Sequence, residues 1–215
     1  MKKILSVLSS LTIVGATVAT VIACSTTDYF KDFEKKVNND ETFIMAVSSS
    51  ECPNCQINDL TLDLMYDNKS SSSEVFKDEL TSGSKYNVKE YYNSNGIDED
   101  IDHIVNSTLL YTGSNDENDV WSDSWGEELG DWILNQERNR EENLLEDGKV
   151  DQSITKSTLG IDGVPFFIYI RKGEYVGFEK GAFGSEQGGG EEGKVPFLDA
   201  FWEHIVLGQW ITPGR

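Results

Sequence analysis

The sequence predicts a mixed α/β domain, because short apolar runs of strand length alternate with segments that repeat their apolar residues at helical spacing. Residues 43–47 and 163–170 are runs of the first kind and suit strands that are buried on both faces of a sheet. Residues 57–65 and 195–207 are segments of the second kind. A chain of 215 residues is long enough for one such domain with an insertion and a sizeable core.

The chain is strongly acidic. It has 18 Lys and Arg residues against 38 Asp and Glu residues, which gives a formal net charge of -20 at pH 7. A surface of this sign repels nucleic acid and anionic membrane surfaces, so we expect neither as a partner of the folded part. Solubility is a sufficient reason for the charge.

Residues 1–23 have the pattern of a targeting signal rather than of a folded element. Lys2 and Lys3 precede an apolar stretch that runs through Val21 to Cys24. This segment resembles a bacterial lipoprotein signal with its lipobox. The resemblance implies that residues 1–23 are removed, that Cys24 is acylated, and that the protein is lipid-anchored at the outer face of the cell membrane. The alternative is an uncleaved transmembrane anchor over residues 4–23, which also leaves the bulk of the chain outside the cell.

Residues 24–40 are predicted to form a polar tether and a first helix. Residues 25–27 are Ser and Thr, and Asp28 is a suitable N-cap for a helix over residues 28–39. The apolar residues on one face of this helix are Tyr29, Phe30, Phe33 and Val37. The rest of the chain, residues 41–215, is assigned to the α/β domain.

A Cys-x-x-Cys sequence follows the first predicted strand and opens a helix that runs to about Tyr66. Unpaired N–H groups and the helix dipole at such a junction favour a thiolate, so Cys52 is the candidate nucleophile. Cys55 is close enough to form a disulfide with Cys52 or to resolve a mixed disulfide. Pro53 fits the first helical position, and Asn54 adds no charge to this active-site loop. A disulfide that closes so short a loop stabilises little, which favours redox chemistry over a structural role.

The middle of the chain is predicted to be mainly helical. A loop over residues 67–73 and one or two helical turns over residues 74–80 precede a second strand over residues 85–92. Residues 97–148 are acidic and are predicted to be helical. An apolar stripe in this segment indicates core packing more than a substrate groove; it consists of Trp121, Trp125, Leu129, Trp132 and Ile133.

The C-terminal part is predicted to contain a hairpin and a final helix. The strand over residues 163–170 is followed by a tight turn and a return strand over residues 175–178. Residues 184–193 are rich in glycine and are predicted to be a loop. The final helix covers residues 195–207, with Pro196 near its start.

The order of these elements resembles that of the thioredoxin superfamily, and two motifs carry the resemblance. They are Cys52-Pro53-Asn54-Cys55 and Gly163-Val164-Pro165. The resemblance implies a three-layer thioredoxin-like fold, with a helical, acidic insertion at about residues 97–148 between the Cys-x-x-Cys helix and the cis-proline strand. It also implies that Pro165 is cis, that the backbone of Val164 receives the substrate chain, and that no cofactor or metal is needed.

One position departs from the family pattern. Many members carry a buried carboxylate six residues before the first cysteine, where it aids proton transfer to the second, and this chain has Ala46 there. The departure implies that thiol turnover is slow or relies on another base.

Three interpretations of the cysteine pair follow. The first is a lipid-anchored thiol–disulfide oxidoreductase that acts on exported proteins with thiols or disulfides and exchanges electrons with a redox partner that the sequence does not identify. The second is a redox-inactive surface lipoprotein that serves as a binding module, which Ala46 favours. The third is a zinc site, for which His103 and His204 are the further ligands outside the carboxylates.

Overall fold

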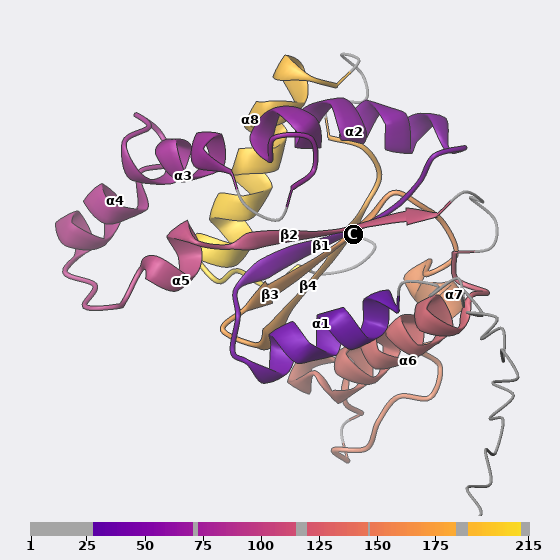
Figure 1. Cartoon of the computed structure of the whole chain (residues 1–215). Helices are drawn as coiled ribbons and strands as arrows, with labels where there is room; N and C mark the ends of the chain where they lie inside the picture. The colour runs from indigo at the N-terminus through magenta and orange to yellow at the C-terminus, as the bar shows by residue number, and fades with distance from the viewer. Residues whose placement is uncertain (1–27, 71–72, 115–119, 146, 184–188, 212–215) are drawn as a thin grey trace, which may run out of the picture.

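The computed structural model describes residues 28–70, 73–114, 120–145, 147–183 and 189–211. In this part of the chain a four-stranded sheet has helices against both of its faces, which confirms the predicted mixed α/β class (Figure 1). The strands are β1 Phe43–Ser49, β2 Thr108–Ser114, β3 Phe166–Arg171 and β4 Glu174–Lys180.

β1 is one of the two central strands of the sheet. The strand order is β2-β1-β3-β4, with β1 parallel to β2 and antiparallel to β3, and with β3 antiparallel to β4. All seven residues of β1 are buried, because strands flank it on both sides and helices cover both faces. Burial on two faces is what the unbroken apolar run of β1 predicts.

The helices come from all parts of the described chain. They are α1 Tyr29–Asn38, α2 Pro53–Met65, α3 Glu74–Thr81, α4 Val88–Asn95, α5 Asp102–Val105, α6 Ser124–Asn139, α7 Lys156–Leu159 and α8 Glu191–Phe201. A 3₁₀ turn at Glu141–Asn143 follows α6, and α8 continues into a π-helical turn at Trp202–Val206.

Two apolar cores lie on opposite faces of the sheet. Ile44 and Ala46 of β1 point into the core under α2 and α8, whereas Met45 and Val47 point into the core under α1 and α6. This alternation follows from the two-residue period of a strand. Full burial of one large side chain such as Phe33 of α1 is worth roughly 1.5–3 kcal/mol, and Phe33 has no exposed surface. On the opposite face, the buried Leu62 and Met65 fix α2 against the sheet in the same way.

Several predicted elements are confirmed. The first helix begins after Asp28, whose carboxylate accepts a hydrogen bond from the Lys31 N–H at 3.1 Å. The segment 74–80 is helical in α3, residues 166–180 form the hairpin of β3 and β4, and α8 contains Pro196. Residues 184–188 of the predicted loop at 184–193 lie outside the described residues, and the prediction is wrong for residues 191–193, which form the first turn of α8.

The predicted strand over residues 85–92 is wrong, because residues 88–95 form α4. Asn87 caps this helix by accepting a hydrogen bond from the Glu90 N–H at 3.0 Å, and Gly96 ends it with a left-handed φ of 64°. Val88 and Tyr92, one helical turn apart, are both buried. Two good caps and this i, i+4 pair outweigh the β propensity of the tyrosines.

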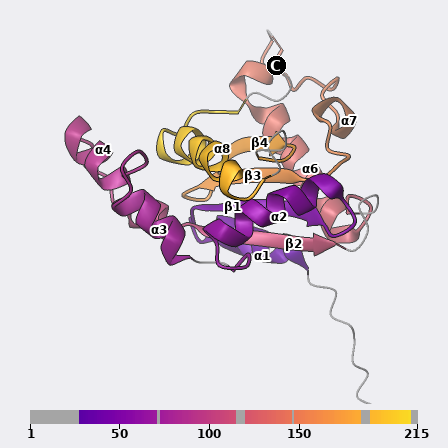
Figure 2. The ribbon, with the colours of Figure 1, turned by 90° about the horizontal axis from the view of Figure 1, so that it is seen from above.

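The predicted helical insertion over residues 97–148 is also wrong, because β2 lies inside it. Leu109, which lies inside the segment predicted to be helical, pairs with Ile44 of β1, and this long-range pairing overrides the local helical pattern. α3, α4 and α5, which follow α2 and precede β2 in the sequence, lie outside the two helical layers that cover the faces of the sheet (Figure 1). They extend beyond the end of the sheet where β2 begins (Figures 1 and 2). α6 instead belongs to the layer that contains α1.

A matched pair of glycines in α6 tests this packing. A Cβ added at Gly126 would collide with the backbone carbonyl of Val120. A Cβ at Gly130 would lie 3.3 Å from Cε of the flexible Lys156 side chain and in ordinary contact with Ile161 Cγ2, at 3.5 Å. We expect Gly126→Ala to lower the free energy of unfolding by about 1–3 kcal/mol through overpacking. Gly130→Ala should change it by less than about 1 kcal/mol, in the stabilising direction of helix propensity. Urea denaturation measures both, and equal effects would contradict the assignment.

Candidate active site

The Cys-x-x-Cys sequence lies where β1 ends and α2 begins. Cys52 is the N-cap of α2, and its Sγ accepts a hydrogen bond from the backbone N–H of Cys55 at 3.3 Å. Pro53 occupies the first turn, where no backbone N–H is needed. Gln56 closes the preceding loop by donating from Nε2 to the carbonyl oxygen of Ser50 at 2.9 Å. The start of α2 therefore directs an N–H group at the Cys52 sulfur, which stabilises negative charge there.

The two cysteines, both present as free thiols, differ in environment. Cys52 keeps 5% of its surface exposed and lies beside the exposed Pro53 and Asn54, whereas Cys55 is completely buried. Burial, together with the hydrogen bond to Cys52, raises the pKa of the Cys55 thiol to about 12. Cys55 therefore stays protonated at neutral pH, and Cys52 is the thiol that a substrate can reach.

A segment far away in the sequence completes the site. The Val164-Pro165 peptide bond is cis, as the resemblance implied, and Pro165 is buried. The Cys52 thiol donates a hydrogen bond to the Val164 carbonyl oxygen at 3.4 Å. Cys52, Cys55 and the Val164-Pro165 segment, which we inferred from separate motifs, thus lie together at one end of the sheet.

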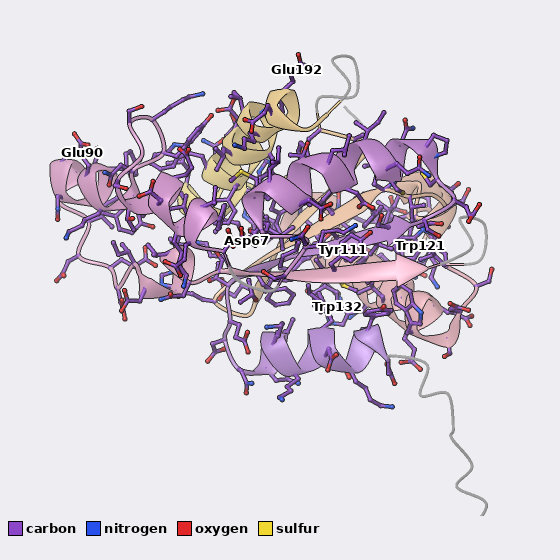
Figure 3. All side chains as sticks on the ribbon, turned by 45° about the horizontal axis from the view of Figure 1, so that its top comes forward. Asp67, Glu90, Tyr111, Trp121, Trp132 and Glu192 are labelled. Atoms are coloured by element: carbon purple, nitrogen blue, oxygen red, sulfur yellow. The ribbon has the colours of Figure 1, made fainter. Side chains whose placement is uncertain are left out.

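Trp121 is a residue that we assigned to the packing stripe, but it borders this site (Figure 3). Its Nε1 donates to the Gly163 carbonyl oxygen at 3.0 Å, and its ring meets the Phe166 ring edge-on at 5.0 Å between centroids. Trp121 therefore holds the segment that precedes Pro165. Trp125, Leu129 and Ile133 of the same stripe are buried core residues, as predicted.

Asn58 is a second residue that the sequence did not single out. It is buried in α2, donates from Nδ2 to the Gly181 carbonyl oxygen at 3.2 Å, and accepts from the Phe183 N–H at 2.7 Å. These bonds tie α2 to the segment after β4. The available sequence signal was the spacing of Asn58, three residues after Cys55 and four before Leu62, which places all three on one face of α2.

Ala46, Cys24 and the two histidines are the remaining residues that the sequence singled out. Ala46 is buried in the middle of β1, so no carboxylate lies at that position. Cys24 and the signal segment lie outside the described residues; within those residues no helix is long and apolar enough to cross a membrane. No group of three or more potential metal ligands occurs in the described part either, and His103 and His204 pair with Glu99 and Glu179.

No protein-family model matches this chain, and searches of curated proteins and of solved structures find no significant match. The function is therefore inferred from the residues and their geometry.

The difference between the two thiols predicts selective alkylation. In the native, reduced Cys24→Ser chain, whose remaining cysteines are Cys52 and Cys55, we expect iodoacetamide near neutral pH to modify Cys52 alone, because Cys55 is buried and has a raised pKa. Peptide mass spectrometry identifies the modified residue, and in denaturant both cysteines should react. Because ionisation of Cys55 requires a pH approaching 12, raising the pH from 7 to 9 should not bring Cys55 labelling to the Cys52 rate. Comparable labelling in the native state would contradict the assignment.

Proposed function

We propose that this protein is a thiol–disulfide oxidoreductase of thioredoxin-like fold, which a lipid on Cys24 anchors to the outer face of the cell membrane. The observation that carries the proposal is the contact between the Cys52 sulfur and the Val164 carbonyl oxygen, at 3.4 Å. It brings a cysteine at a helix N-terminus beside the backbone segment that the resemblance implies for substrate binding. The strand order, with helices on both faces, is compatible with the thioredoxin-like fold.

The reaction is an exchange of disulfide bonds. In the reducing direction the Cys52 thiolate attacks a substrate disulfide, a bond forms between Cys52 and one substrate sulfur, and the other sulfur leaves as a thiolate. Cys55 then attacks the Cys52 sulfur, which forms the Cys52–Cys55 disulfide and releases the second substrate thiolate. The protein dithiol loses two electrons and the substrate disulfide gains them. A dithiol or disulfide partner must return the pair to its starting state, and the oxidising direction is the reverse.

The backbone of Val164 supplies a place for the substrate chain. A substrate that replaces the Cys52 thiol as the hydrogen-bond donor to the Val164 carbonyl would lie extended beside the cysteine pair, in the manner of strand addition. Main-chain recognition of this kind is tolerant of sequence. It suits an enzyme that acts on exported proteins as a class.

The redox proposal predicts distinct effects of the two cysteines. We expect the reduced protein to accelerate insulin reduction by a dithiol, Cys52→Ser to abolish the acceleration, and Cys55→Ser to accumulate a mixed disulfide at Cys52 because resolution is blocked. Turbidity measures the reaction, and mass spectrometry detects the trapped adduct. An inactive wild type that also fails to form a Cys52–Cys55 disulfide in a glutathione buffer would refute the enzymatic function.

The anchor proposal is tested separately at Cys24. In a bacterial host with a lipoprotein pathway, labelled palmitate should enter the wild-type chain and Cys52→Ser equally, and Cys24→Ser should take up none. Gel fluorography of the immunoprecipitated chain measures the incorporation. Label in Cys24→Ser would contradict the assignment of Cys24, without bearing on the thiol chemistry.

A binding module with idle cysteines is the second candidate, and a pocket favours it. The pocket is lined by α1, α6, the turn between β3 and β4, and Trp210. That turn contacts the start of β1 through the Gly173 N–H and the Glu41 carbonyl oxygen at 2.9 Å, so the pocket and Cys52 lie at opposite ends of a strand roughly 20 Å long. The Arg140 guanidinium lies 4.7 Å from the centre of the Trp210 ring, at the pocket wall. Activity that depends on Cys52 decides against this candidate.

A further inference from the structure

A cluster of polar side chains lies between α2 and the sheet, next to Cys55. We call Ser48, Asp59, Lys69 and Tyr111 the Asp59 cluster. Asp59 follows Cys55 by four residues in α2, so both side chains lie on the same helical face. Tyr111 of β2 pairs with Ala46 of β1, and Ser48 is two residues beyond Ala46. Tyr111, Ala46 and Ser48 therefore share the face of the sheet that α2 covers.

The outer half of the cluster is well connected. The Tyr111 hydroxyl donates to both carboxylate oxygens of Asp59, at 3.0 and 3.1 Å. Lys69 Nζ lies 3.1 Å from Asp59 Oδ2 and 4.8 Å from the centre of the Tyr111 ring. The Asp59 side chain is 19% exposed, so its carboxylate can exchange protons with water.

The inner half of the cluster is a buried hydroxyl that faces two other groups. Ser48 is 3% exposed, and its Oγ has no hydrogen bond of regular geometry. Its hydroxyl is near enough to the Cys55 thiol and to the Tyr111 hydroxyl to act on both, in the direction that lowers the pKa of each. A buried hydroxyl without a hydrogen bond of regular geometry costs free energy, so its retention here needs a reason. The reason that we infer is its place between Cys55 and Tyr111.

Cys55 needs a base in order to act. Burial raises the pKa of Cys55 to about 12 and also raises the pKa of Tyr111, so both are protonated at neutral pH. Many thioredoxin-like proteins carry a buried carboxylate six residues before the first cysteine, and this chain has Ala46 at that position. The titratable groups on this side of Cys55 are Asp59 and Asp63 of α2, Lys69 of the following turn, and Tyr111 of β2. Asp59 alone of the two carboxylates receives the Tyr111 hydroxyl.

We propose that Asp59 is the base for Cys55 and acts through the Tyr111 and Ser48 hydroxyls. The proposal rests on the proposed function and applies to the step that resolves the mixed disulfide. The Cys55 sulfur bonds to the Cys52 sulfur as the bond from Cys52 to the substrate sulfur breaks, and the substrate leaves as a thiolate. The Cys55 proton passes to Ser48, the Ser48 proton to Tyr111, and the Tyr111 proton to the Asp59 carboxylate, which releases it to water. The reverse transfers serve the opposite direction.

The test measures the reactions of Cys52 and Cys55 as two successive steps. A reduced full-length Cys24→Ser chain, in which Cys52 and Cys55 are the remaining thiols, is mixed with excess dithiobis-nitrobenzoate in a stopped-flow instrument. The first thionitrobenzoate released reports attack by Cys52, and the second reports resolution by Cys55. The rates are measured against pH for Asp59→Asn, Tyr111→Phe and Ser48→Ala in the same background. Asp63→Asn is the matched control, because it removes a carboxylate one turn further along α2 that also pairs with Lys69, at 3.9 Å.

We expect the first release to be unchanged in all variants. The second release should slow by about 10²-fold in Asp59→Asn, which is the lower end of what a positioned base contributes, and by about tenfold or more in the two hydroxyl variants. The difference in second-release rate between these variants and the parent chain should become smaller as the pH rises, because hydroxide then takes the Cys55 proton. Asp59→Glu, which restores a carboxylate, should recover part of the second-release rate. A structural role for Asp59 would give neither the pH dependence nor the recovery.

Two results would overturn the proposal. One is that Asp59→Asn, Tyr111→Phe and Ser48→Ala show a normal first release and also a second release at the rate of the parent chain. The other is an equal slowing in Asp59→Asn and Asp63→Asn, which would indicate general electrostatics rather than a relay. Failure of the proposed function looks different, because the parent chain itself would then release no second thionitrobenzoate.

Discussion

The side chain of Cys52 makes the two contacts on which the arrangement of the site depends. Its sulfur caps α2 through the Cys55 N–H, and its thiol reaches the carbonyl of Val164. The first contact belongs to the local sequence, since any N-cap must satisfy the free N–H groups of the first turn. The second joins segments that are 112 residues apart. A single side chain thus couples the start of a helix to the start of a strand.

The sheet explains why this coupling is possible. β1 and β3 are adjacent and antiparallel, so the end of β1 and the start of β3 lie at the same end of the sheet, with Val47 paired to Phe166. Cys52 follows β1 and Val164 precedes β3, so the pairing brings both to one place. The core under α2 and α8 holds α2, and hence Cys52, in position against this end of the sheet. Trp121 holds the other partner through the Gly163 carbonyl.

Those parts of the fold that depend on strong local patterns were predictable from the sequence. β1, α2 and the hairpin have uninterrupted apolar runs or clear caps, and the two motifs of the site are short and local. β2 was not predictable in the same way, because Leu109 and its neighbours fit a helical face as well as a strand, and only pairing with β1 decides between them. Because residues 97–148 were predicted to be helical, the sequence also offered no reason to place Tyr111 on the same sheet face as Ser48.

The position of Asp59 has a physical rationale beside that of Ala46. A carboxylate at position 46 would lie in the middle of β1, at 1% exposure, where keeping it charged requires a large loss of hydration. Asp59 lies one helical turn beyond Cys55, 3.1 Å from Lys69 Nζ and 19% exposed, so a carboxylate there loses less hydration than it would at position 46. The price of this placement is distance from the buried thiol, which the proposed relay through the Tyr111 and Ser48 hydroxyls would span. The centre of the sheet can then remain entirely apolar, which favours the tight packing of β1 that positions Cys52 in the first place.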